Sequence, residues 1–349
     1  MPGRNPAGTV DVSPSETAPD HLGEPVMRRT TTALVIAVVA GAALASPAAA
    51  GAPSSDLQPQ TLTRGPDIAV PHIEDGYFVD GERRIELPGT VARVIGPSMG
   101  GWMVGTHRTN AVGERRGGRV VHVLPGDEVR TVLRDVDPAD ISVSEDGSSL
   151  LGVPDTGRSR AKVKVWAPID GSVVATRTFR GHPEVVTADG AKALVRTTTR
   201  TFWWNFARNE VRRPLTTRLT GPASSTHDLL TTFTRDPYLG GCTRVVRLSR
   251  PKVKRWSSCA DRVAAFSPDG AQMLTYDILT DGLGPGAIRL REIDGTLLAT
   301  WTTGWFSAWS WESPGTVLLE TNGRRKAAVV RCTTARCENA TDPVDATAP

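Results

Sequence analysis

One short stretch, AAFSPDGAQMLTYD at residues 264–277, decides the fold because the chain repeats its pattern several times. The stretch contains an apolar run, a tight turn at residues 267–270 and a second, half-apolar run. Three further copies carry a glycine at the same place in the turn: ISVSEDGSSLLGV from residue 141, EVVTADGAKALVRT from 184 and SAWSWESPGTVLLET from 307. Two weaker copies lie around Gly100 and, without the glycine, around His227.

The spacing of these turns predicts the architecture. The turns are about 37 to 47 residues apart, close to the length of one four-stranded propeller blade. A second hairpin follows in each unit, as in VKVWAPIDGSVVAT from residue 163 and AIRLREIDGTLLAT from 287, and its Asp-Gly dipeptides suit two-residue turns. We therefore expect an all-β chain forming a β-propeller of six or seven four-stranded blades. The hairpin at 76–87 matches only the back half of a unit and is expected to complete the ring or to form a partial seventh blade.

The repeated phrases resemble those of a known group of propellers. FSPDG at 266–270, VSEDG at 143–147 and W-x-x-x-D-G at 166–171 are similar to WD40-like and TolB-type β-propeller repeats. The resemblance covers about residues 66–340 and implies a binding platform, although some propellers are hydrolases, lyases or lactonases. The Gly-His start and Trp-Asp end of true WD40 repeats are missing at regular positions, which leaves the Asp-His-Ser/Thr-Trp network of that family without support.

Two segments precede the repeats. Residues 1–26 are polar and are interpreted as a disordered extension or as the result of a misassigned start. Residues 27–50 have two arginines, an apolar run and small residues before a predicted cut near Ala50, which is typical of a secretory signal peptide. The apolar run is shorter than the ~20 residues of a membrane span. We expect residues 51–65 to be a linker, 66–340 the propeller and 341–349 a tail.

Charge and composition limit the partners. Removing residues 1–50 leaves 38 of the 41 Lys and Arg and 33 of the 37 Asp and Glu, an excess of +5 that we expect to be spread along the chain. This excess is too small to predict nucleic-acid binding. We expect a secreted monomer without stable membrane insertion, whose partner is an unknown protein or a cell-surface polymer. The excess of arginine over lysine, with abundant alanine, is typical of a high-GC bacterial source such as an actinobacterium.

The four cysteines form two local pairs, Cys242 with Cys259 and Cys332 with Cys337. Each pair brackets a short hairpin-like stretch, and facing positions on neighbouring strands lie about 5 Å apart, within disulfide reach. Four cysteines permit three connectivities, of which the local one is favoured in an oxidising compartment. A zinc site is the alternative, but neither spacing is C-x-x-C and no histidine lies near either pair, so we expect no metal and no cofactor.

Several polar residues could carry chemistry, and each has a structural explanation. Ser98 lies in GPSMG, a G-x-S-x-G pattern, but a strand-like segment follows it where a nucleophile elbow needs a helix. Asp146 and Asp269 lack the clustered oxygen ligands of a calcium loop, so turn formation is the preferred interpretation. The histidines after the leader form no metal-binding spacing, and His182 is interpreted as leading into a repeat unit. They are His72, His107, His122, His182 and His227.

Two surfaces could bind a ligand. TWTTGWFSAWSWES at 300–313 offers tryptophans for carbohydrate stacking, although packing between blades is the preferred role. The basic run from Arg244 to Arg255 could meet an anionic polymer, although a solvated hairpin edge is preferred. The leading hypothesis is a binding or scaffolding module with a ligand site at one face of the central channel and no catalytic residues. The alternative is a propeller enzyme, a lactonase, lyase or glycosidase, with acids or histidines converging at the channel mouth.

Overall fold

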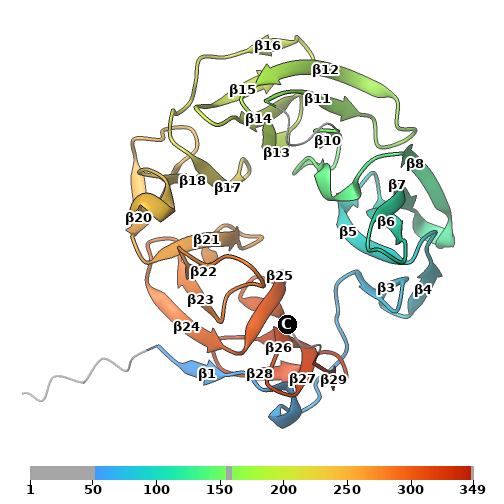
Figure 1. The fold of residues 1–349 in the computed structure, drawn as a ribbon, viewed down its shortest axis with the longest axis vertical. Coiled ribbons are helices and arrows are strands. Elements are labelled where there is room, and N and C mark those ends of the chain that lie inside the picture. The colour runs from blue at the N-terminus through green and yellow to red at the C-terminus, as the bar shows by residue number, and fades with distance from the viewer. Residues whose placement is uncertain (1–51, 155–158, 347–349) are drawn as a thin grey trace, which may run out of the picture. The chain divides into compact units, whose positions relative to one another are not determined.

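The computed structural model describes residues 52–154 and 159–346. The chain divides into two compact units, Met1–Ala49 and Ala50–Pro349. The first unit, with the predicted extension and signal peptide, lies outside the described residues. The second unit contains 29 described strands and four short 3₁₀ helices, and its strands form seven sheets (Figure 1).

The seven sheets surround a common centre as blades of a propeller, and each blade is a meander of strands that follow one another in the chain (Figure 1). Blade I contains β2 (His72–Glu74), β3 (Tyr77–Asp80) and β4 (Arg83–Glu86). Blade II contains β5 (Val91–Ser98), β6 (Gly101–Thr109), β7 (Arg115–Val123) and β8 (Val129–Arg134), and blade III contains β9 (Ile141–Val143), β10 (Leu150–Gly152), β11 (Arg160–Trp166) and β12 (Val173–Arg180). Blade IV contains β13 (Glu184–Asp189), β14 (Lys192–Arg196), β15 (Thr201–Asn205) and β16 (Glu210–Val211). Blade V contains β17 (Thr220–Ser224), β18 (Leu229–Phe233), β19 (Thr243–Arg247) and β20 (Lys254–Ser258). Blade VI contains β21 (Asp261–Phe266), β22 (Gln272–Asp277), β23 (Ala287–Glu292) and β24 (Leu297–Thr302). Blade VII contains β25 (Trp305–Ser313), β26 (Thr316–Asn322), β27 (Lys326–Cys332) and β28 (Cys337–Asn339). The 3₁₀ helices are η1 (Pro59–Thr61), η2 (Pro125–Asp127), η3 (Pro138–Asp140) and η4 (Pro237–Leu239).

The prediction of an all-β propeller is therefore confirmed, and the number of blades is seven. The repeated turn joins the first two strands of each blade, as predicted. The four glycines that mark the clear copies have φ between 52° and 78°, as at Gly270, in the left-handed region that glycine enters without steric cost. In the copy that lacks glycine, Asp228 takes this conformation with φ 55°, because aspartate tolerates it better than most side chains.

Blade I is the partial seventh blade that was one of the two predicted outcomes, but the hairpin at 76–87 forms its second and third strands instead of the back half of a unit. β2 precedes that hairpin and pairs with β3 across a turn at Asp75 and Gly76, so the blade contains the front half of a unit as well. β2 contacts β5, the innermost strand of the next blade, and the sheet ends at β4. Blade I is thus a three-stranded seventh blade without an outermost strand.

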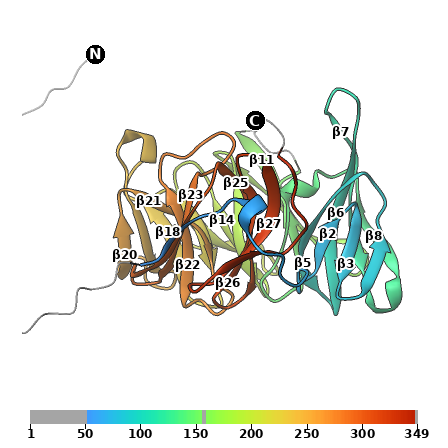
Figure 2. The same ribbon diagram turned by 90° about the horizontal axis from the view of Figure 1, so that it is seen from below.

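Residues before blade I are bound to the last two blades, as Figure 2 shows in blue against orange and red. β1 (Ser54–Asp56) pairs in parallel with β24 and becomes the fifth strand of blade VI. Arg64 forms a parallel bridge to Asn339 in β28, and η1 contacts β27. The segment at 51–65, expected as a linker, therefore covers outer edges that would otherwise be open for pairing. Within the expected tail, β29 (Val344–Asp345) pairs with β27.

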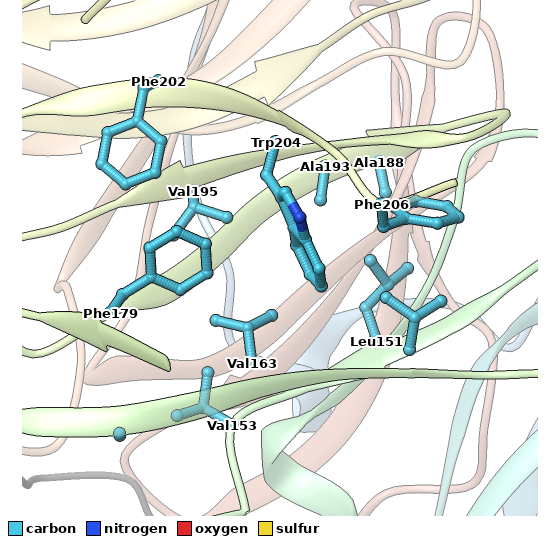
Figure 3. Close-up of a cluster of buried hydrophobic side chains, with 12 residues drawn as sticks. Leu151, Val153, Val163, Phe179, Ala188, Ala193, Val195, Phe202, Trp204 and Phe206 are labelled. Carbon is cyan, nitrogen blue, oxygen red and sulfur yellow. The ribbon is translucent and has the colours of Figure 1, made fainter. Parts of the chain in front are cut away.

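The hydrophobic core lies between neighbouring blades. Figure 3 shows the cluster between blades III and IV, where the fully buried Trp204 meets Phe179 and Phe206 edge-on, with ring centroids 5.7 and 5.9 Å away. Successive side chains of a strand point to opposite faces, so every second residue enters this cluster. On β11, Val163 and Val165 are buried while the lysine between them is not. Five further clusters of this kind join blades I to II, II to III, IV to V, V to VI and VI to VII.

Candidate functional site

Blades VII and I are joined differently from the other neighbours. Among the described residues, no buried apolar cluster contains side chains from both blades. Instead, residues 66–72 cross from blade VII to blade I, and Ile68 packs in a small cluster with Leu318 and Ala340. We call this junction the seam.

An ion pair holds the crossing segment against blade VII, and we call Glu312 and Arg331 the clamp. The Arg331 guanidinium donates to both carboxylate oxygens of Glu312, at 2.5 and 2.7 Å, and to the carbonyl oxygens of Pro66 and Asp67, at 2.9 and 2.8 Å. The amide of Ala69 donates to Glu312 Oε1 at 2.8 Å. Burial alone would raise the pKa of Glu312, but the hydrogen bonds and the charge of Arg331 hold it below its usual value.

A cavity of about 500 Å³ lies at the seam, between the inner strands of blades I, II and VII. We call it the seam cavity. Its wall is mainly apolar and aromatic, with residues of the crossing segment at 66–72 and of β2, β5, β6, β25, β26 and β27. The apolar lining includes Ile68, Ile73, Val94, Trp102, Trp309 and Trp311. Cavities of this size, with few polar groups, are typical of ligand sites.

The tryptophans of β25 combine packing with exposure to the cavity. Trp309 and Trp311 pack against the core between blades VI and VII, as the sequence predicted, and both also line the seam cavity. Trp309 is supported by Tyr276 of blade VI at a centroid distance of 5.4 Å, and the guanidinium of Arg262 lies 4.7 Å from the Tyr276 ring centre. The indole N–H of Trp311 is buried and has no partner among the described residues. Trp309 is thus an aromatic wall of the seam cavity supported from blade VI, whereas the Trp311 N–H is enclosed by the protein.

The charged and titratable side chains of the seam cavity are few, and each has a partner within the protein. Nδ1 of His72 lies 2.9 Å from the Val70 carbonyl oxygen, and Glu320 accepts from the Ser307 hydroxyl at 2.9 Å. Arg93 donates to the carbonyl oxygen of Ile141 at 3.0 Å, and burial lowers its pKa. No group of three or more His, Cys, Asp or Glu suited to a metal ion occurs in the described parts of the chain. Aromatic and apolar side chains, together with three charged or titratable residues, therefore line the cavity.

Ser98 serves the contact between two blades. It ends β5, is 3% exposed, and its hydroxyl donates to the Gly147 carbonyl oxygen of blade III at 2.6 Å. The buried His122 lies close by, but its Nε2 contacts the backbone oxygen of Ser98 at 3.0 Å rather than the hydroxyl. A strand, β6, follows the turn. This geometry supports the structural interpretation of GPSMG.

Asp146 and Asp269 make matching contacts in blades III and VI. Each accepts a hydrogen bond at 2.6 Å from the serine hydroxyl two residues earlier and another, at 3.2 or 3.1 Å, from the amide two residues later. For Asp269 the hydrogen bond from Ser267 is the main cause of a lowered pKa. Both aspartates therefore stabilise the turn, as the sequence predicted.

The turns also contact one another around the ring. Glu145 of blade III accepts from Thr187 of blade IV and from the amides of Ser225 and Thr226 of blade V, at 2.7 and 2.9 Å. Burial would raise the pKa of Glu145, but these hydrogen bonds lower it. Further round, His227 Nε2 lies 2.8 Å from the Pro268 carbonyl oxygen of blade VI. Together with the contact from Ser98, these interactions tie the turns of blades II to VI; among the described residues, none involves the corresponding turns of blades VII and I.

The remaining predicted features lie away from the seam cavity. Both predicted cysteine pairs are at disulfide distance, with sulfurs 2.03 Å apart for Cys242–Cys259 and 2.06 Å for Cys332–Cys337. The basic run from residue 244 occupies β19, the turn after it and the outer strand β20, as expected for a hairpin edge. His182 lies between β12 and β13, where one blade leads into the next. Among the described residues, no helix has the length and apolar character needed to cross a membrane.

Comparison with known proteins shows similarity of fold. The chain matches no known protein family and no curated protein. A protein of unknown function from Desulfotomaculum acetoxidans aligns with a TM-score of 0.50 and 10% identity, over 78% of this chain and 94% of that one. The protein lmo1340 from Listeria monocytogenes gives 0.49 and 12%, over 73% and 83%, and Hsv2 from Kluyveromyces lactis gives 0.45 and 12%, over 69% and 74%. At these identities the likeness concerns the fold alone, and the site must be interpreted from its own residues.

Proposed function

We propose that this protein is a secreted binding module that holds a short segment of a neutral cell-surface saccharide in the seam cavity. The observation that carries the proposal is Trp309, whose ring lines the cavity while Tyr276 supports it from blade VI. Pyranose rings present flat C–H faces that stack on such indoles. An aromatic ring fixed before binding loses little conformational freedom when the ligand arrives.

Two further observations support this ligand class. Trp102 and Trp311 also line the cavity, so a sugar chain would meet aromatic surface at more than one point. The two cysteine pairs are consistent with the oxidising surroundings of an exported protein, as the predicted signal peptide at 27–50 would require. Binding is favoured over catalysis because His72 and Glu320, the titratable groups of the cavity wall besides Arg93, are each engaged within the protein.

Isothermal titration and tryptophan fluorescence with neutral hexasaccharides of glucose, N-acetylglucosamine and mannose would test the proposal. We expect W309A to weaken binding at least tenfold relative to the wild type, on the scale of a lost aromatic contact. W305A is the matched control, because Trp305 lies on the same strand but does not line the seam cavity, and it should change affinity less than twofold. W311F keeps an aromatic ring in the cavity wall and should weaken binding less than W309A.

Equal losses in W305A and W309A, or no binding of any neutral hexasaccharide, would contradict the proposal. Mass spectrometry of the hexasaccharides after incubation separates binding from catalysis. Intact sugars are expected, whereas shorter products would favour the propeller enzyme.

A further inference from the structure

A second cavity, of about 490 Å³, opens between blades III and IV, and we call it the arginine groove. Four arginines line it, and its wall contains no aspartate or glutamate from residues 52–154 and 159–346. Arg177 and Arg180 belong to β12, the outermost strand of blade III, Arg200 precedes β15, and Arg212 follows β16. The consecutive threonines at 197–199 add hydroxyl groups to the same wall. The groove is therefore lined by hydrogen-bond donors of one charge.

Three of these arginines have no counter-ion among the residues that the structure describes. Arg180, Arg200 and Arg212 are exposed, and none of them forms an ion pair or side-chain hydrogen bond with a described residue. Arg177 is held at the wall by a hydrogen bond of 2.9 Å to Asn209 Oδ1, with its guanidinium 5.9 Å from the centre of the Phe179 ring. Like charges that converge without partners repel one another, and a bound anion would relieve this repulsion.

The charge of the surrounding blades favours the same kind of ligand. Residues 160–255 contain 19 Lys and Arg but 6 Asp and Glu, an excess of +13 in a chain whose net charge is +4. Among the described side chains of this stretch there is one ion pair, Arg196 with Glu184. The positive charge is thus concentrated in blades III to V, contrary to the even spread expected from the sequence, and the rest of the chain carries −9.

We infer that the arginine groove binds the negatively charged sugars of an acidic polysaccharide. Guanidinium groups match the oxygens of carboxylate, sulfate and phosphate groups in a paired geometry, and the volume suits a few sugar units. Nucleic acid is less suited, because the ring surfaces needed for base stacking are absent from the groove: Phe179 and Phe202 are 7% and 6% exposed. The arginine groove shares no lining residue with the seam cavity, so this inference stands apart from the proposed function.

The test uses dextran sulfate oligosaccharides of about six sugars, longer than the few units that a cavity of this size holds, with neutral dextran of the same length for comparison. R180Q/R200Q removes two charges from the groove, and R324Q/R325Q removes two from an exposed turn of blade VII as the matched control. We expect R180Q/R200Q to weaken binding more than tenfold and the control less than twofold, with neutral dextran not bound at all. The dependence of log affinity on log salt concentration should become less steep by about two in R180Q/R200Q.

Circular dichroism and melting temperature should be unchanged in both variants, because the substituted side chains are exposed. Equal losses in the two variants would show attraction to overall charge and overturn the inference. Binding of neutral dextran that R180Q/R200Q weakens would overturn it as well. An oligonucleotide of equal charge that binds more tightly than dextran sulfate and is also weakened by R180Q/R200Q would reassign the groove to nucleic acid. W309A should leave dextran sulfate binding unchanged, which separates this result from the test of the seam cavity.

Discussion

Replacing Arg331 by methionine tests whether the clamp holds the seam together. The side chains of Arg331 and Glu312 are 12% and 8% exposed, so R331M leaves a buried carboxylate with the Ala69 amide as its remaining donor. Removing one partner of a buried ion pair costs about 3–5 kcal/mol, whereas an exposed pair contributes about 0–1 kcal/mol. For a domain of this size, such a loss corresponds to a fall in melting temperature of roughly 5–10 °C.

Urea unfolding and hydrogen exchange measure this effect and its location. We expect the amides of residues 66–72 to exchange faster in R331M, while those around Trp204, far from the seam in the ring, keep their protection. R325M is the matched control, because Arg325 is exposed on the same blade, and it should change stability by less than about 0.5 kcal/mol. A loss below about 1 kcal/mol in R331M, or unchanged exchange at Ala69, would refute the assignment.

The pH dependence provides a second measurement of the clamp. Because the folded state lowers the pKa of Glu312 below the ordinary value of 4.5, the unfolded state binds this proton more readily. The stabilisation is therefore complete above pH 4.5 and is lost as the pH falls through the lower, folded value. The wild type should lose stability in this range, and R331M should lose less. Parallel pH profiles for the two proteins would contradict this account.

Three other predictions concern the ring as a whole. C242A/C259A should lower the free energy of unfolding by about 3 kcal/mol in urea, because the disulfide closes a loop whose ends are 17 residues apart and so restricts the unfolded chain. A loss smaller than the scatter between replicates would contradict this. Burial lowers the pKa of His122 below 6.5, so stability should fall as the pH drops below 6.5, less so in H122N; an NMR titration showing an ordinary pKa for this ring would refute it. Gly171→Ala should lower the free energy of unfolding by more than about 2 kcal/mol, because the new Cβ would lie 2.0 Å from a carbonyl oxygen of blade II. Gly190→Ala should lower it by only about 1 kcal/mol, because nothing lies within 4 Å of its new Cβ. Equal melting temperatures for the two variants would argue against this difference.

The fold could be predicted from the sequence because its signals are local. The turn around Gly270 is stabilised by residues within five positions of one another, such as Ser267 and Asp269, so each copy of the turn leaves the same short pattern. The pairing of Ser54–Asp56 with β24 leaves no such pattern. It joins residues about 247 positions apart in a parallel pair. No turn connects the two strands, so no local sequence pattern indicates that they pair.

The candidate sites were hidden for a related reason. The seam cavity is lined by strands and loops that lie far apart in the sequence, and the tryptophans of β25 look the same in sequence whether they pack or bind. The arginine groove was not evident from the net charge of the whole chain, because the acidic residues of the other blades offset most of the excess of +13 in residues 160–255. Counting charge blade by blade, once the repeat is known, would have found it.

The added outer strand β1 imposes an order on assembly. Ser55 pairs with Trp301, which lies about 246 residues later in the chain, so blade VI cannot receive this strand until nearly the whole ring has been synthesised. The entropy of closing a loop grows only with the logarithm of its length, so late closure costs little in final stability, but it is a slow long-range step. Until it happens, the outer strands β24 and β28 remain open to pairing with other chains. A chain shortened to begin at residue 66 should therefore build the seven blades and then aggregate through the last two.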